Sequence, residues 1–100
     1  MFVCTLKFVQ IEYDAAKNAR NIRERGLSFE RVKDFDFEGA RFAVDGRKDY
    51  GEVRYVGVGL LDDRLHVLCF TEGSMGIRII SFRKANAREV QRHEQAKSTD

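Results

Sequence analysis

The sequence contains no proline, no low-complexity segment and no internal repeat. Such features usually mark linkers or repeat arrays, so their absence predicts that residues 1–100 form one domain. No apolar run reaches the roughly 18 residues that a membrane-spanning helix needs. The apolar opening 1–9 is short and lacks both a basic leader and a small-residue cleavage site, so it does not resemble a signal peptide. We therefore expect a cytoplasmic protein without membrane contact.

Residues that hold metals and cofactors are also scarce. Cys4 and Cys69 lie far apart and match neither a zinc-finger nor a Cys-x-x-Cys spacing, which favours reduced, structural thiols. The two histidines have no carboxylate or thiol at a ligand-like spacing, so no metal site is expected. The chain has no glycine-rich phosphate loop, because Gly57 and Gly59 fall inside a strand-like run and indicate close packing or bending. We expect no cofactor.

The first part of the chain predicts one strand and two helices. Residues 8–13 alternate apolar and polar side chains, as an exposed strand does. Asp14 can cap a helix that begins at residue 15 and ends at Gly26. Ser28 can cap a second short helix, which stops before Gly39.

The rest of the chain predicts four strands and a terminal helix. Asp62-Asp63 separates two runs rich in β-branched residues and indicates a tight hairpin. Asn86 and Glu89 have the spacing of a capping box for a polar helix over 87–96. The predicted strands are 40–45, 53–61, 64–71 and 77–82. The resulting α+β domain consists of an N-terminal strand, two helices, a four-stranded antiparallel meander and a C-terminal helix, with the strand order left open.

Positive charge is modest in amount, with a net charge of +2, but most of the basic residues are arginines. A guanidinium group is always charged and forms a planar fork suited to phosphate. The segment from Arg78 onward is rich in basic residues, which makes a phosphate-bearing partner plausible. For any single arginine, a solvated surface position is the commoner interpretation.

The two histidines are the residues most suited to proton transfer near neutral pH. His66 lies on the strand face opposite Leu65 and Val67, where a histidine is more often a surface residue than a catalyst. His93 follows Glu89 by one helical turn. It could act as a general acid or base, or be a solvated helical residue.

Three arginines, Arg54, Arg78 and Arg83, flank or interrupt apolar strand residues. Metal-free cleavage of RNA needs a deprotonated 2′-hydroxyl, a stabilised phosphorane charge and a protonated leaving oxygen. Fixed guanidinium groups serve the second need well. Strict alternation places Arg78 and Arg83 on opposite faces of one strand, so they reach one site only if a bulge or the strand's end intervenes.

Several blocks of residues, taken in order, provide a more specific signal. They are 14–18 (DAAKN), 21–22, 26–29 (GLSF), 49–52 (DYGE) with Arg54 and Gly57, 60–71 (LLDDRLHVLCFT), 77–81 (IRIIS), 83–85 and 88–89. In this order the blocks resemble the BrnT family of toxins, and the resemblance covers nearly the whole chain from Ile11 to Glu94.

The resemblance implies a fold similar to RelE-type ribonucleases and a toxic activity that arrests translation by cutting RNA. It implies neutralisation by a BrnA-like antitoxin in an assembly of two toxins and two antitoxins. The ribbon-helix-helix part of the antitoxin would bind operator DNA, so the toxin would reach DNA only through its partner.

The resemblance also implies roles for individual residues. Arg54 and Arg83 would stabilise the transition-state phosphate, and Arg78 would position the substrate. His93 would transfer protons, although many relatives have tyrosine there, and Glu72 is a less favoured general base.

One departure from the family pattern affects RNA binding. Relatives commonly have Lys-His before the glycine where this chain has Glu24-Arg25, so Arg25 could hold phosphate instead. Lys84 and Arg88 are further candidates for RNA binding.

Two alternative functions stay open. The terminal helix has few apolar anchors apart from Ala87 and Val90. This suits a non-catalytic module that binds a DNA-binding partner and acts as co-repressor. Direct nucleic-acid binding without cleavage is less favoured, because the phenylalanines occupy core-like positions instead of forming stacking clusters.

Overall fold

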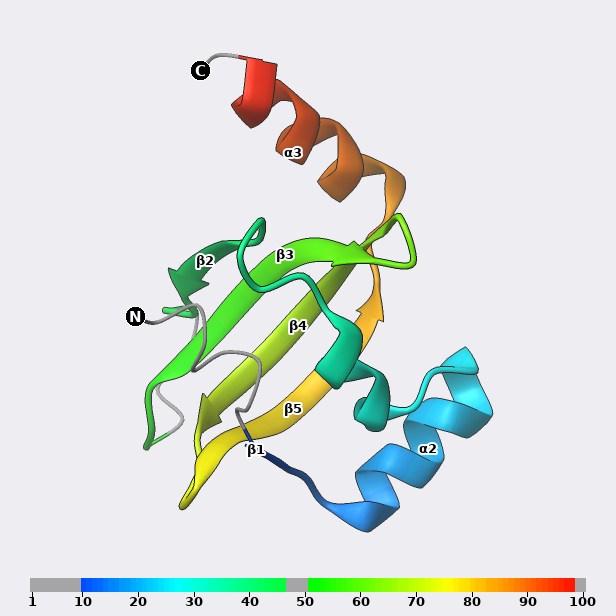
Figure 1. The fold of residues 1–100 in the computed structure, drawn as a ribbon, viewed down its shortest axis with the longest axis vertical. Coiled ribbons are helices and arrows are strands. Elements are labelled where there is room, and N and C mark those ends of the chain that lie inside the picture. The colour runs from blue at the N-terminus through cyan, green and yellow to red at the C-terminus, as the bar shows by residue number, and fades with distance from the viewer. Residues whose placement is uncertain (1–9, 47–50, 99–100) are drawn as a thin grey trace.

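The computed structural model describes residues 10–46 and 51–98 (Figure 1). Cys4, the apolar opening, the start of the predicted strand 8–13 and the Asp49-Tyr50 part of one motif block lie outside the described residues. The elements are β1 (Gln10–Glu12), α2 (Ala15–Arg25), the 3₁₀ helix η1 (Phe29–Asp34), β2 (Arg41–Val44), β3 (Arg54–Leu61), β4 (Arg64–Glu72), β5 (Gly76–Lys84) and α3 (Ala87–Ser98).

The strands form one mixed five-stranded sheet in the order β1-β5-β4-β3-β2. β2 to β5 pair antiparallel in sequence order, and β1 pairs parallel with β5 over Gly76–Arg78. The α+β prediction is confirmed, but the sheet differs in detail from the predicted four-stranded antiparallel meander, because β1 adds a fifth, parallel strand. Alternation along β1 shows which residues share a face and carries no information on strand direction, so the parallel pairing could not be predicted.

The two N-terminal helices begin and end where their caps are. The carboxylate of Asp14 accepts hydrogen bonds from the backbone N–H groups of Ala16 and Lys17, and Gly26 ends α2 in the left-handed conformation at φ 65°. Ser28 caps the next element through the N–H of Glu30. That second helix is a six-residue 3₁₀ helix that ends at Asp34, several residues before the predicted limit at Gly39.

Two asparagines of α2 tie this helix to its neighbours. The side-chain oxygen of Asn18 accepts the backbone N–H of Phe29 at 2.8 Å. The buried Nδ2 of Asn21 donates to the carbonyls of Leu27 and Phe82, both at 2.9 Å. Because a buried amide needs such partners, Asn21 fixes the end of α2 against β5.

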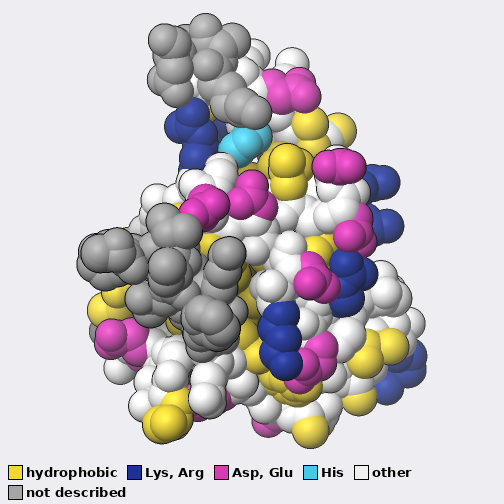
Figure 2. Space-filling view, viewed as in Figure 1, with side chains coloured by type: hydrophobic (Ala, Val, Ile, Leu, Met, Phe, Trp, Pro, Cys, Tyr) yellow, Lys and Arg dark blue, Asp and Glu magenta, His cyan; other side chains and the backbone are white. Residues whose placement is uncertain are grey.

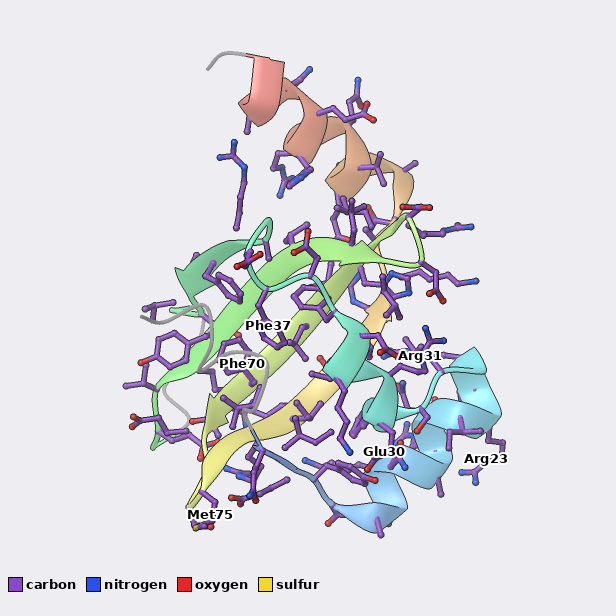
Figure 3. The ribbon with its side chains drawn as sticks, in the orientation of Figure 1. Arg23, Glu30, Arg31, Phe37, Phe70 and Met75 are labelled. Carbon is purple, nitrogen blue, oxygen red and sulfur yellow. The ribbon has the colours of Figure 1, made fainter. Side chains whose placement is uncertain are left out.

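The main core lies between the sheet and η1. η1 crosses in front of the sheet in Figure 1, and Figure 3 shows Phe37 and Phe70 on the same side of the sheet as η1. Gly59 faces this core, where an added Cβ would lie 2.7 Å from the Cβ of Ala40. The close-packing interpretation of the strand glycines is therefore confirmed. The largest fully buried side chains are Phe29, Val32, Leu68, Ile79 and Phe82.

His66 belongs to this core and not to the sheet surface. Its side chain is 3% exposed, and its ring centroid lies 5.5 Å from that of Phe82. Its Nδ1 is 2.8 Å from the carbonyl oxygen of Arg64. The surface interpretation is wrong because this face of β4 is the one that η1 covers.

A smaller apolar cluster holds α3 against the opposite face of the sheet. Leu65, Val67 and Ala85 form it, with Val56, Val58 and Val90 packed against them. The predicted capping box of α3 is confirmed, with 2.8 Å hydrogen bonds in both directions between Asn86 and Glu89. α2 and α3 lie at opposite ends of the molecule (Figure 1). Within residues 10–46 and 51–98, no helix has the length and apolar character to span a membrane.

Candidate active-site groove

A β-bulge in β5 places the strand arginines on one face of the sheet. Cys69 pairs with Ser81 and Phe70 pairs with Ile79, which leaves Ile80 as an extra residue. Ile79 and Phe82 both face the main core, where they are 1% and 0% exposed. The bulge therefore turns Arg78 and Arg83 to the opposite face together. It meets the condition that the sequence pattern set for a shared site.

A groove of about 730 Å³ lies on this face, between the sheet and α3. We call it the α3 groove. Three of the proposed catalytic residues, Arg54, Arg83 and His93, line it, and Arg41 and Arg92 line it as well. Val56, Val58, Val67 and Cys69 form part of its wall. Four arginines and two carboxylates among the described lining residues leave an excess of positive charge, which suits an anionic substrate.

Arg41 and Arg92 are not among the site residues predicted from the sequence. Their positions in the sequence offer a weak indication of which residues they lie beside. Arg41 shares its strand face with Ala43, and Arg92 is one turn from Glu89. Neither signal shows which face of strand or helix borders a groove. Figure 2 shows a histidine side chain beside Lys or Arg side chains at the end of the molecule where α3 lies in Figure 1.

Glu52 joins two of the predicted arginines. Its carboxylate accepts a hydrogen bond from Arg54 Nε at 3.2 Å and from Arg78 Nη2 at 2.6 Å. Arg54 and Arg78 both lie opposite Thr71 in the strand register, so the three form one row across the sheet. Arg78 is not among the described residues that line the α3 groove. Its link to the groove runs through Glu52.

Glu89 holds Arg83 in a bidentate ion pair. Arg83 Nη1 and Nη2 donate to the two carboxylate oxygens, each at 2.8 Å. Hydrogen bonds from Arg83, and a further one from the Asn86 backbone N–H, lower the pKa of Glu89 from 4.5 to about 2, although partial burial raises it. Glu89 is thus a carboxylate at neutral pH and a weak base, suited to orienting Arg83. The sequence pattern predicted only a capping role for Glu89.

Comparison with protein families identifies the chain. A family model described as the ribonuclease toxin BrnT of type II toxin–antitoxin systems matches residues 13–89. The chain belongs to the BrnT family. No curated protein matches its sequence.

The BrnT family consists of ribonuclease toxins that act with an antitoxin partner. The matched range includes Arg54, Arg78, Arg83 and Glu89. It ends before Arg92 and His93, so the family match gives these two residues of α3 no support.

The other predicted residues of the BrnT-family chain lie outside the α3 groove. Arg25 and Lys84 line a second hollow of about 310 Å³ with Leu27 and Arg83. Arg88 is exposed on α3 and is not among the described residues that line either space. Glu72 is exposed at the end of β4 and is likewise not among the described lining residues of the groove.

Proposed function

We propose that this BrnT-family toxin is a metal- and cofactor-independent endoribonuclease and that the α3 groove is its active site. The observation that carries the proposal is the convergence of Arg54 and Arg83 on one groove, together with His93. The β5 bulge places Arg83 on the same face of the sheet as Arg54 and Arg78. Guanidinium groups held in place by carboxylates supply fixed positive charge at the phosphate, which is often the largest catalytic contribution.

The proposed reaction is an internal transfer at phosphorus. The 2′-oxygen of one ribose attacks the adjacent phosphate, the bond from phosphorus to the 5′-oxygen breaks, and a 2′,3′-cyclic phosphate and a 5′-hydroxyl result. Because DNA lacks the 2′-hydroxyl, the reaction is confined to RNA. Arg54 and Arg83 stabilise the charge on the phosphate, and Arg78 positions the substrate through Glu52. His93 moves a proton to or from the reacting oxygens.

In the cell, we propose that RNA cleavage inhibits translation and that a BrnA-like antitoxin neutralises it in an assembly of two toxins and two antitoxins. The few apolar contacts of α3 support partner binding: among its described residues, Val90 packs against the small apolar cluster. The antitoxin would carry the contact with operator DNA. Arg25, Lys84 and Arg88 are proposed to bind RNA outside the groove.

Induction of the chain alone tests the proposal against the co-repressor alternative. The wild type should arrest growth and produce RNA fragments with 5′-hydroxyl ends, whereas Arg54→Ala and Arg83→Ala should do neither. Arg64→Ala is the matched control, since Arg64 is an exposed strand arginine that is not among the described groove residues. Full toxicity of both variants would refute the site. Intact RNA combined with partner-dependent operator binding would favour the co-repressor.

A further inference from the structure

The second hollow, which we call the α2 hollow, lies between the end of α2 and the end of β5. Arg25, Leu27, Arg83 and Lys84 line it, so its described lining is cationic apart from one leucine. The face shown in Figure 2 differs, because there Lys and Arg side chains are interspersed with Asp and Glu. The positive charge of the α2 hollow therefore suits an anion. The hollow also adjoins the α3 groove, because Arg83 lines both.

Hydrogen bonds between α2 and β5 hold the two sides of this hollow in place. In the described residues, β1 covers the edge of β5 only over Gly76–Arg78, so the later part of that edge faces the end of α2. Asn21 connects the two elements through its hydrogen bonds to the carbonyls of Leu27 and Phe82. The side-chain oxygen of the same asparagine accepts Arg25 Nη1 at 3.1 Å. Arg25 is thus oriented by the residue that ties the end of α2 to β5.

Arg83 lines both the α3 groove and the α2 hollow. Lys84 follows it in β5, and consecutive residues of a strand point to opposite faces. The two spaces are therefore separated by the width of a single strand at its edge. A ligand with one phosphate can occupy only one of them, whereas a polymer with a phosphate at every residue can occupy both.

We propose that the α2 hollow binds a second phosphate of the RNA strand whose scissile phosphate lies in the α3 groove. The inference rests on the proposed ribonuclease function and adds to it a substrate requirement: single-stranded RNA with at least two phosphates. Contacts to phosphate fix the register of a strand and carry no sequence information. The hollow thus favours longer RNA irrespective of its sequence.

Cleavage of randomised RNA pools of two lengths tests the length requirement. Arg25→Ala/Lys84→Ala should lower kcat/KM for a hexaribonucleotide pool by about tenfold or more and leave a diribonucleotide pool unaffected. Lys17→Ala/Arg20→Ala is the matched control, because it removes two exposed positive charges from α2 outside the described lining of both spaces. An equal loss on both pools, or no loss on either, overturns the proposal.

Binding of an uncleavable 2′-O-methyl hexanucleotide pool separates this proposal from the proposed reaction. The salt dependence of binding should weaken by about 0.7 in log–log slope for Arg25→Ala/Lys84→Ala, because each neutralised phosphate of a single strand contributes about 0.7. An unchanged slope overturns the second phosphate site even if the wild type cleaves RNA. A weakened slope without any cleavage supports the site and contradicts the proposed reaction.

Discussion

Each arginine that we propose for catalysis is held by a carboxylate. Glu52 accepts hydrogen bonds from Arg54 and Arg78, and Glu89 accepts two from Arg83. Such pairs reduce the net positive charge but fix the direction of each guanidinium before substrate binds. A preorganised charge does not have to reorient during the reaction, which is why fixed groups stabilise a transition state better than mobile ones.

The lowered pKa of Glu89 predicts that the folded chain loses stability in acid. Its pKa is about 2 in the folded chain and 4.5 by reference, so the folded state favours its ionised form. The resulting stabilisation is present above pH 4.5 and is lost as pH falls towards 2. Allowing for its partial exposure, we expect a contribution on the order of 2 kcal/mol.

Urea unfolding at several pH values measures this contribution. Glu89→Gln should flatten the decline in the free energy of unfolding between pH 4.5 and 2. Glu94→Gln, an exposed position on the same helix, should follow the wild type. A Glu89→Gln curve parallel to the wild type would contradict the assignment.

At the scale of elements, irregular features place the site. The bulge at Ile80 changes the phase of β5, so that Ile79 and Phe82 both fill the core while Arg78 and Arg83 share the other face. The strand glycines have a comparable structural role in β3. Gly59 leaves room for Phe35 and Ala40, and Gly57 leaves room for the ring of Phe42. In β3 the missing side chains thus allow neighbouring residues to approach the sheet closely.

Gly59→Ala should destabilise the chain by about 1–3 kcal/mol, because its Cβ would meet Ala40 Cβ at 2.7 Å and Phe35 at 2.9 Å. Gly46→Ala is the control, since an added Cβ there meets nothing within 4 Å. Its effect should stay within about 0.5 kcal/mol. Thermal or chemical unfolding compares the two, and equal midpoints would show that the close approach at Gly59 relaxes without cost.

At the scale of the whole molecule, the two faces of the sheet have different coverings. η1 covers one face over the large core, and α3 covers part of the other over a small cluster. Met75, at the turn between β4 and β5, lies at the end of the sheet remote from α3 (Figure 3). The α3 groove exists because α3 contacts only one end of its face.

Removal of α3 should therefore affect activity more than folding. A chain of residues 1–86 keeps every buried residue of the large core but loses Glu89, Arg92 and His93. We expect a folded chain by circular dichroism, with a lower melting temperature because Leu65 and Val67 become exposed. RNA cleavage should fall by at least about a hundredfold.

A chain of residues 1–96 is the control for this truncation, because it keeps all described lining residues of the groove. It should cleave RNA at the wild-type rate. Wild-type cleavage by residues 1–86 would show that the reaction takes place outside the α3 groove.

Local sequence patterns were sufficient to predict the elements and the family. Caps at Asp14, Gly26 and Asn86 act through neighbouring backbone groups, so they can be recognised along the chain. The hairpin at Asp62-Asp63 is another local signal, and both residues adopt positive φ. The ordered motif blocks predicted the BrnT family, which the family match confirms.

Only the tertiary structure decided what depends on contacts between distant segments. The parallel pairing of β1, the burial of His66 under η1 and the bulge at Ile80 each follow from packing against a remote element. The same holds for Arg41 and Arg92, whose place in the groove depends on where α3 lies. Periodicity specifies which residues share a face, whereas only the pairing of strands and the docking of helices determines what that face contacts.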